Sequence, residues 1–197
     1  LVFEGKGAVV EQWSSQHLRD AVGIWASMLV EYSDGPSFAE NMGQGQAPPI
    51  GVEFLKWSLG ASQHTLPVLL FAASERFSGD RDIGRYVAAG RALKRELQDV
   101  LGDGAILIAP THPRPAPRHN HPLLRPMDFV YTGIFNVLET PATACPMGTG
   151  SQGLPVGVQV IGPPGGDHLT IAAAVLLERA NGGWAAPIAS LDQTPSP

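Results

Sequence analysis

Three observations predict an α/β fold for this chain. Two short apolar runs, residues 105–109 and 156–161, are typical of buried strands because their apolar residues do not alternate with polar ones. Segments with helical apolar spacing precede the first run and follow the second. Hydrophobic residues make up 44% of the 197 residues and charged residues 16%, which indicates a folded chain with one sizeable core.

The first predicted helix begins at Ser15, whose side chain can cap it, and ends at Glu31. Trp25 lies with other apolar residues near one face of this helix. The stretch 33–49 is rich in Gly, Pro, Ser and Gln and predicts a loop. No glycine flanks the pair Ser14 and Ser15, so a capping role is favoured over a catalytic one.

An apolar helical hairpin is predicted over residues 52–77. Its first arm is expected to stop at Gly60, and Thr65 can cap the second arm. Composition favours a buried hairpin, but an apolar cap that touches a membrane or forms the mouth of a lipid channel remains open. Lys56 is its one basic residue before Glu75, so its attraction to anionic lipid would be weak.

The clearest amphipathic pattern covers residues 78–101, where Ser78 opens a predicted helix and Gly102 ends it. The strand over residues 105–109 follows. Residues 111–126 are rich in proline and histidine and predict an irregular loop, because proline restricts itself and the residue before it.

The second strand leads through a Gly- and Pro-rich turn into a helix that Asp167 is expected to cap and that ends near Ala180. Pro163 and Pro164 remove amide donors from this turn, so it does not suit a phosphate. Two buried strands cannot form a covered sheet by themselves. The sequence therefore predicts a partial domain whose strands need partners from elsewhere.

Composition excludes several classes of site and partner. The net charge of −5 argues against nucleic acid, and the longest apolar run is too short to span a membrane. The single Cys145 excludes an intramolecular disulfide, and its apolar neighbours favour a buried, inert thiol over a nucleophile. His119 and His121 could place two imidazoles on the same side of an extended chain, but zinc needs a third protein ligand and usually supporting hydrogen bonds around it. We therefore interpret His112, His119 and His121 as parts of a surface loop. No metal or other cofactor is expected.

Six motifs between Pro110 and Trp184 carry a resemblance to a known family. They are Pro110-Thr-His-Pro113, Tyr131-Thr-Gly-Ile-Phe-Asn136, Pro141-Ala-Thr-Ala-Cys-Pro146, Gly153-Leu-Pro-Val-Gly-Val-Gln-Val160, Asp167-His-Leu-Thr170 and Gly182-Gly-Trp184. In this order they resemble the C-terminal part of the amidase-signature hydrolases, most of all the fatty-acid amide hydrolases of the second type. Glu139 departs from that pattern, which has small or apolar residues there.

The resemblance implies the C-terminal part of an amidase-signature α/β/α sandwich with a mixed sheet. This partial domain would cover residues 1–188, and residues 189–197 would form a disordered tail. In the family's reaction, a lysine deprotonates a bridging serine, which activates a nucleophilic serine to form an acyl-enzyme. These three residues belong to a part of the enzyme that precedes this chain. No catalytic residue is therefore expected here, and the chain alone is expected to be inactive.

The resemblance also places the Tyr131 motif along an acyl channel beside the catalytic serine. Ile134 and Phe135 can help to supply the apolar walls that an alkyl chain needs, with ordinary core packing as the alternative for each residue. The residues expected to bind substrate are Phe129, Tyr131, Thr132, Gly133 and Asn136.

The expected function is hydrolysis of amides, above all lipid amides, by an intracellular enzyme. Its expected partners are a lipid amide substrate and the missing N-terminal part of the same domain, and a homodimer is compatible with the sequence. Membrane contact would run through residues 52–77. Two alternatives stay open. One is a non-catalytic amidase-like subunit of a transamidation complex, which would favour a polar site over an apolar channel. The other is a module that binds a membrane or a partner.

Overall fold

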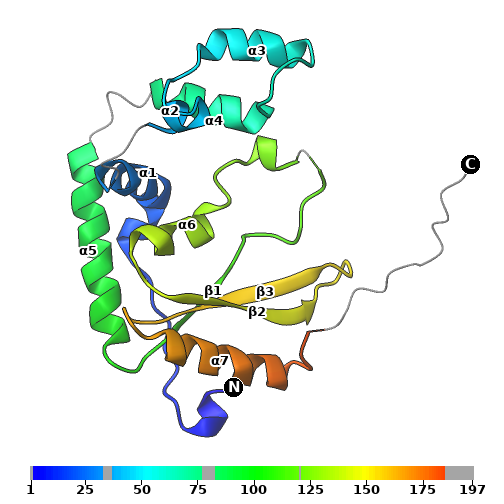
Figure 1. Cartoon of the computed structure of the whole chain (residues 1–197). Coiled ribbons are helices and arrows are strands. Elements are labelled where there is room, and N and C mark those ends of the chain that lie inside the picture. Colours follow the sequence, from blue (N-terminus) through cyan, green and yellow to red (C-terminus); the bar gives the residue numbers. More distant parts are fainter. Residues whose placement is uncertain (1, 33–36, 77–82, 120, 185–197) are drawn as a thin grey trace, which may run out of the picture.

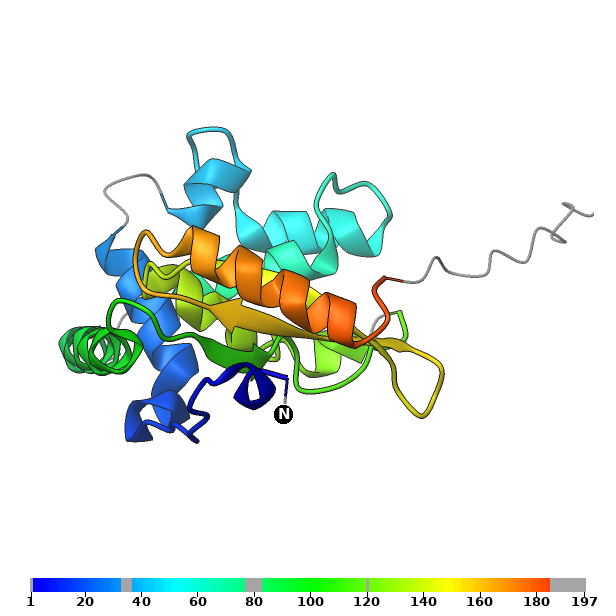
Figure 2. The same cartoon turned by 90° about the horizontal axis from the view of Figure 1, so that it is seen from below.

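A computed structural model describes residues 2–32, 37–76, 83–119 and 121–184, arranged around a small central sheet (Figure 1). Helix α7 (Asp167–Ala180) covers one face of the sheet, and helices α6 (Val130–Val137) and α1 (Ala21–Glu31) lie beyond the other face. Figure 2, seen from below, shows α7 lying over the sheet and running roughly along its strands. The α/β class that the sequence predicts is confirmed.

The remaining elements are helices and the strands of the sheet; α2, α3 and α4 lie near the top of Figure 1 and α5 lies at its left side. The helices are α2 (Phe38–Met42), α3 (Ile50–Ser58), α4 (Leu66–Arg76) and α5 (Ile83–Leu101), with short 3-10 helices η1 (Glu4–Lys6), η2 (Gln16–Asp20) and η3 (His121–Leu124). The strands are β1 (Leu107–Pro110), β2 (Ala142–Thr149) and β3 (Pro155–Ile161).

The sheet has the order β1-β3-β2, and both pairings within the described residues are antiparallel. The mixed sheet of a larger domain therefore stays a prediction. Strand β2 was not expected from the sequence, because Pro146 has no amide to donate to a neighbouring strand. The structure accommodates this proline opposite Gly157, and the register shifts between Pro146 and Thr149.

Strand β3 is central, whereas β1 lies at an edge of the sheet. The predicted strand at 156–161 is confirmed within one residue, and its last residues Val160 and Ile161 are fully buried. The predicted strand at 105–109 begins later, at Leu107. Its expected burial on both faces is wrong for Ile108, which is 41% exposed because no described strand or helix covers that side of the edge.

The loop predicted at 33–49 contains the short helix α2. Ser37 Oγ accepts a hydrogen bond from the Glu40 amide at 3.1 Å, and the Ser37 amide donates to Glu40 Oε2 at 2.7 Å. This reciprocal pair is a capping box, whose sequence signal is Ser followed three residues later by Glu. The many Gly and Pro residues around this capping box favoured a loop in the sequence-based prediction.

Two predicted helix starts are displaced by a few residues. Ser15 caps η2 instead of a continuous helix, and α1 begins only at Ala21. Asp167 lies within the first turn of α7 and makes no capping hydrogen bond, because Gly166 occupies the cap position. Its negative charge still suits the positive end of the helix dipole.

The predicted hairpin and long helix are present. Gly60 and Gly102 end α3 and α5 in the left-handed conformation, with φ of 69° and 47°, which costs glycine little. Ser78, Phe77 and the tail at 189–197 lie outside the described residues. None of the helices in the described ranges is long and apolar enough to cross a bilayer.

The main core lies between α1, α5, α6 and the inner face of the sheet. Its fully buried side chains include Ile24 and Met28 of α1 and Leu93 and Leu97 of α5. A second cluster joins α7 to β2 and β3. The main core holds α6 in place, because Ile134, Phe135 and Val137 belong to it.

Candidate functional site

Helix α6 and the residue before it carry all five residues that the sequence analysis associates with substrate. Phe129 precedes the helix, and its carbonyl accepts hydrogen bonds from the Thr132 and Gly133 amides, both at 3.0 Å. The Thr132 hydroxyl donates to the same carbonyl at 3.0 Å. Three donors therefore secure the first turn of α6 on Phe129.

Four aromatic rings connect α6 to the helices above it. Phe129 packs edge-on against Trp25 of α1, with ring centroids 4.6 Å apart, and Trp25 packs against Phe71 of α4 at 6.5 Å. Phe71 in turn meets Phe38 of α2 at 4.7 Å. This aromatic row, made of Phe129, Trp25, Phe71 and Phe38, connects the apolar hairpin to the start of α6 through Trp25 of α1.

Gly133 lies in the contact between α6 and α1. It is buried, and a Cβ built on it would lie 3.1 Å from the Phe129 ring and 3.2 Å from Trp25 Cδ1. Ile134, Phe135 and Val137 of the same helix are also buried in the main core. This face of α6 packs against protein.

The other face of α6 is open. Tyr131 is 41% exposed, and Thr132 and Asn136 are exposed as well. The structure therefore separates the five predicted residues. Phe129 belongs to the aromatic row and Gly133 packs against it. Tyr131, Thr132 and Asn136 lie on the accessible side of α6, where a bound molecule could reach them.

A buried side-chain amide holds the first turn of α6 against the sheet. Gln159 of β3 is 3% exposed, and its Nε2 donates to the Tyr131 carbonyl at 2.7 Å and to the Pro110 carbonyl at 3.0 Å. One side chain thus links the end of β1, the middle of β3 and the first turn of α6. Hydrogen bonds of this kind make the position of α6 well defined.

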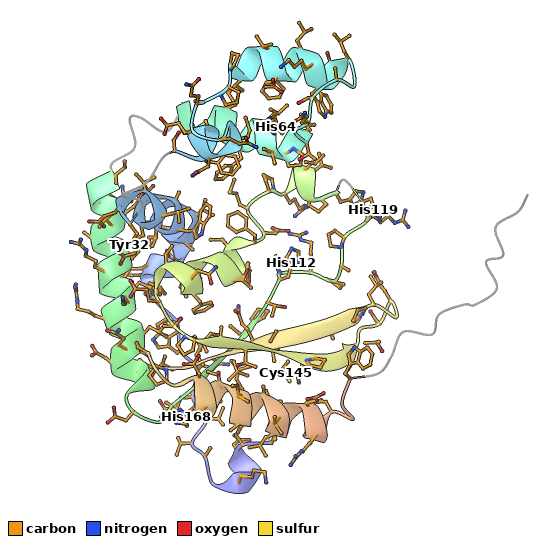
Figure 3. The ribbon with its side chains drawn as sticks, in the orientation of Figure 1. Tyr32, His64, His112, His119, Cys145 and His168 are labelled. Carbon is orange, nitrogen blue, oxygen red and sulfur yellow. The ribbon has the colours of Figure 1, made fainter. Side chains whose placement is uncertain are left out.

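The loop before α6 is ordered by ion pairs and turns. Arg114 Nε donates to Asp128 Oδ2 at 2.8 Å, and His112 Nε2 lies 4.0 Å from the same oxygen. His112 Nδ1 donates to the Arg114 carbonyl at 2.8 Å. Figure 3 shows His112 on the inner side of this loop and His119 at its outer end. Among the described residues, no group of three or more His, Cys, Asp or Glu side chains could hold a metal ion.

Ser15 has the structural role that the sequence predicts. Its hydroxyl donates to Glu96 Oε2 at 2.6 Å and accepts from the His17 amide at 3.2 Å. His17 Nε2 lies 3.5 Å from the other oxygen of Glu96. The Ser15 hydroxyl thus joins η2 to α5 through the Glu96 carboxylate while it caps η2, which is the contact pattern of a structural serine.

Cys145 is buried between β2 and α7, as its apolar neighbours predict. Its thiol donates to the Ala174 carbonyl at 3.4 Å. Burial, with a smaller contribution from the Glu178 carboxylate, raises the pKa of the Cys145 thiol above its ordinary value of 9.0. A neutral, enclosed thiol is a poor nucleophile.

Glu139, which departs from the family pattern, lies on the surface. Its carboxylate pairs with Lys94 of α5 at 3.1 Å. It follows the end of α6 with a left-handed backbone, φ 55°, before the chain enters β2. The carboxylate therefore joins the C-terminal end of α6 to α5 and is not part of the aromatic row.

Sequence reasoning missed Trp25 and Gln159 as supports of this region. Trp25 belonged to an ordinary apolar helix face, and nothing local links it to residues about a hundred positions later. For Gln159 there was a signal, because it is the one polar side chain in the apolar run 156–161. A buried amide requires hydrogen-bond partners, which only the fold identifies.

Comparisons with known proteins identify the family that the sequence motifs resemble. A protein-family model described as Amidase matches residues 4–171. Fatty-acid amide hydrolase 2 of Homo sapiens is 37% identical over 189 residues, which cover 92% of this chain and 35% of that protein. Fatty-acid amide hydrolase 2-A of Danio rerio is 37% identical over 186 residues, with the same coverage. The chain thus spans about a third of the length of these curated relatives.

Among solved structures, a glutamyl-tRNA(Gln) amidotransferase subunit from Thermotoga maritima superposes with a TM-score of 0.61. The superposition covers 94% of this chain and 39% of that one, at 22% sequence identity. At this identity the likeness concerns the fold.

Proposed function

Because this chain belongs to the amidase family, we propose that it forms the C-terminal part of an amide hydrolase that acts on fatty-acid amides. The observation that carries the proposal is the 37% identity to fatty-acid amide hydrolase 2 over 92% of the chain. The catalytic serines and lysine would lie upstream. Residues 1–188 would then be one part of a larger domain.

The geometry of Ser15 supports an upstream location for the catalytic residues. Its hydroxyl is committed to Glu96, and neither Ser14 nor Ser15 has a neighbouring glycine. The buried Cys145 offers no alternative nucleophile. The described residues therefore suit a supporting role, in which they shape the site and supply no attacking group.

Helix α6 would form one wall of the acyl channel. Its open face carries Tyr131, Thr132 and Asn136, and the aromatic row behind it supplies a rigid apolar backing. Phe129 and Gly133 would act through that backing, because they pack against Trp25. An alkyl chain needs an apolar surface with a few polar groups, and the open face of α6 would supply polar groups of that kind.

The hairpin of α3 and α4 would contact a membrane or the mouth of the channel. Large apolar side chains are exposed on it, among them Leu55, Leu59 and Leu70, while Leu69 and Ala72 face inward. The aromatic row joins this hairpin to α6. A lipid amide that leaves a membrane at the hairpin would then meet α6 next.

A non-catalytic transamidation subunit is the second candidate. The fold likeness to an amidotransferase subunit favours it, but at 22% identity that likeness extends to the fold alone. The 37% identity to fatty-acid amide hydrolase 2 over 92% of the chain favours the lipid amide hydrolase. We therefore place the lipid amide hydrolase first.

An activity-based experiment separates these candidates. A fluorophosphonate probe should label the intact protein upstream of this segment, and that protein should hydrolyse oleamide. The 197-residue chain alone should be neither labelled nor active, because it lacks the serine motif and the lysine. Labelling of Ser14 or Ser15, together with turnover by the isolated chain, would refute the proposal. An intact protein that is unlabelled and inactive would favour the transamidation subunit.

A further inference from the structure

The loop between β1 and α6 concentrates positive charge on an acidic chain. Residues 112–128 hold three arginines and three histidines but only one carboxylate, Asp128, while the whole chain has a net charge of −5. Part of this loop surrounds a cavity of about 270 Å³. We propose that this cavity binds the carboxylate of a long-chain fatty acid.

The charges in the cavity are not balanced internally. Arg114 is neutralised by Asp128, whose Oδ2 lies 2.8 Å from Arg114 Nε. Arg125 lines the same cavity, and no carboxylate of the described residues pairs with it. His112 and His121 add two imidazoles to the lining. One guanidinium is therefore left to attract an anion, and a guanidinium can hold a carboxylate through two parallel hydrogen bonds.

The cavity is held open by local structure. The His121 amide donates to the Arg118 carbonyl at 3.1 Å, and the Arg125 amide donates to the Pro122 carbonyl at 3.0 Å. The Asp128 amide then donates to the Arg125 carbonyl at 3.3 Å. Successive turns, together with the prolines of the loop, reduce the entropy that the loop would lose when it binds a ligand.

The lining also favours an alkyl chain over a small inorganic anion. Leu124 borders the cavity and is 80% exposed, and Pro117 and Pro122 add further apolar surface. A ligand that has both a carboxylate and an alkyl chain would cover Leu124 as it pairs with Arg125. The loop continues directly into Phe129 and α6, where we place the acyl channel.

The identity of the ligand rests on the proposed function, because hydrolysis of a fatty-acid amide releases this acid. Water attacks the acyl-enzyme, the ester bond to the serine breaks, and the acid leaves as a carboxylate at neutral pH. A cationic cavity beside the channel would attract that product and not the neutral amide. The cavity would therefore serve as a product site separate from the catalytic serine.

The test measures binding of oleate, below its micellar concentration, to the intact protein by calorimetry. Arg125→Gln should weaken oleate binding by at least about tenfold, since a charged hydrogen-bonded pair is lost. Arg125→Lys should recover only part of the affinity, because it restores the charge but not the two parallel hydrogen bonds. Arg118→Gln is the matched control, because Arg118 lies in the same loop but does not line the cavity, and it should leave binding unchanged. Higher salt should weaken binding to the unmodified protein.

Two further ligands identify the source of the carboxylate and the role of the charge. Oleyl alcohol has the same chain without the charge, and its binding should not depend on Arg125. Vesicles of anionic phospholipid should bind the unmodified protein and Arg125→Gln equally well. The inference is overturned if Arg118→Gln weakens oleate binding as much as Arg125→Gln does. It is also overturned if vesicle binding depends on Arg125 and oleate binding does not. Binding is measured without turnover, so the inference can fail while amidase activity persists, and the reverse also holds.

Discussion

At the scale of single residues, two buried polar side chains, those of Gln159 and Glu53, hold neighbouring segments of the chain in place. Gln159 binds two carbonyls from different elements, and Glu53 ties α3 to the connection that leads to α4. Glu53 is 7% exposed, Lys56 Nζ donates to its Oε1 at 2.6 Å, and Ser62 Oγ donates to its Oε2 at 2.9 Å. A buried charge is tolerated where such partners compensate its lost hydration.

The first prediction concerns the pH dependence of the hairpin. Hydrogen bonds from Lys56 first, and then from Ser62, hold the pKa of Glu53 below its ordinary value of 4.5. A lowered folded pKa means that the stabilisation is complete above the unfolded pKa and is lost as pH falls through the folded one. Glu53→Gln should therefore destabilise the intact protein at pH 7, and this difference should shrink below about pH 4.5.

Thermal unfolding of both proteins across this pH range measures the effect. Asp103→Asn, an exposed carboxylate outside the hairpin, serves as the control and should show almost no effect at either pH. A constant difference between Glu53→Gln and the unmodified protein from pH 7 to pH 3 would contradict the assignment.

At the scale of elements, close helix packing determines how α1, α5 and α6 meet. Gly90 of α5 faces α1, and a Cβ built there would lie 2.1 Å from Met28 Sδ and 2.9 Å from Ile24 Cγ2. Both neighbours are fully buried and have little room to move. Gly51 of α3 is the opposite case, since nothing lies within 4 Å of its Cβ position.

The second prediction compares these two glycines. Gly90→Ala should destabilise the protein by about 1–3 kcal/mol, because overpacking forces α1 and α5 apart. Gly51→Ala should stabilise it by about 0.5–1 kcal/mol, because alanine favours the helix and meets no neighbour. Denaturant unfolding of the intact protein measures both. Equal effects of the same sign would show that α1 and α5 pack more loosely than these distances indicate.

The third prediction concerns the open face of α6. Gly133→Trp would be the obvious choice from the sequence, but Gly133 packs against Trp25, so that change would disrupt the core. Asn136→Trp adds bulk on the exposed side instead. It should reduce hydrolysis of long-chain amides by about tenfold relative to short ones, because only the long chain reaches the filled space.

Kinetics of the intact protein with amides of increasing chain length would measure this discrimination. Ile171→Trp provides a control, because Ile171 is an exposed apolar residue on α7, across the sheet. It should affect all chain lengths equally, if at all. An equal loss for short and long amides with Asn136→Trp would place α6 outside the channel.

At the scale of the whole molecule, the chain leaves apolar surface open at the sheet edge. A groove of about 1250 Å³ lies between the N-terminal segment, β1 and α7, with Phe3, Ile106 and Leu177 in its lining. Strand β1 borders it with no described strand on its outer side. The hairpin of α3 and α4 adds the exposed Leu55 and Leu59.

The fourth prediction is that the 197-residue chain alone does not behave as a stable monomer. An open strand edge and a large apolar groove favour association. The isolated chain should aggregate or bind a hydrophobic dye strongly, and co-expression with the upstream segment should suppress both. Light scattering and dye fluorescence measure this. A sharp, reversible thermal transition of a monomer in dilute buffer would contradict the partial-domain proposal.

The sequence by itself determined the class of fold, most helices, strand β3, the glycine stops and the family. These follow from local chemistry, since apolar spacing, caps and motifs act within a few residues. Tertiary structure decided strand β2 and the burial of Gly133. The start of helix α2 had a local signal, the capping box, but the surrounding Gly and Pro residues favoured a loop. Pro146 is tolerated because Gly157 lies opposite, and Gly133 is buried because Trp25, far away in the sequence, packs on it. Contacts between distant residues have no local signature, so only the folded chain reveals which face of α6 is open.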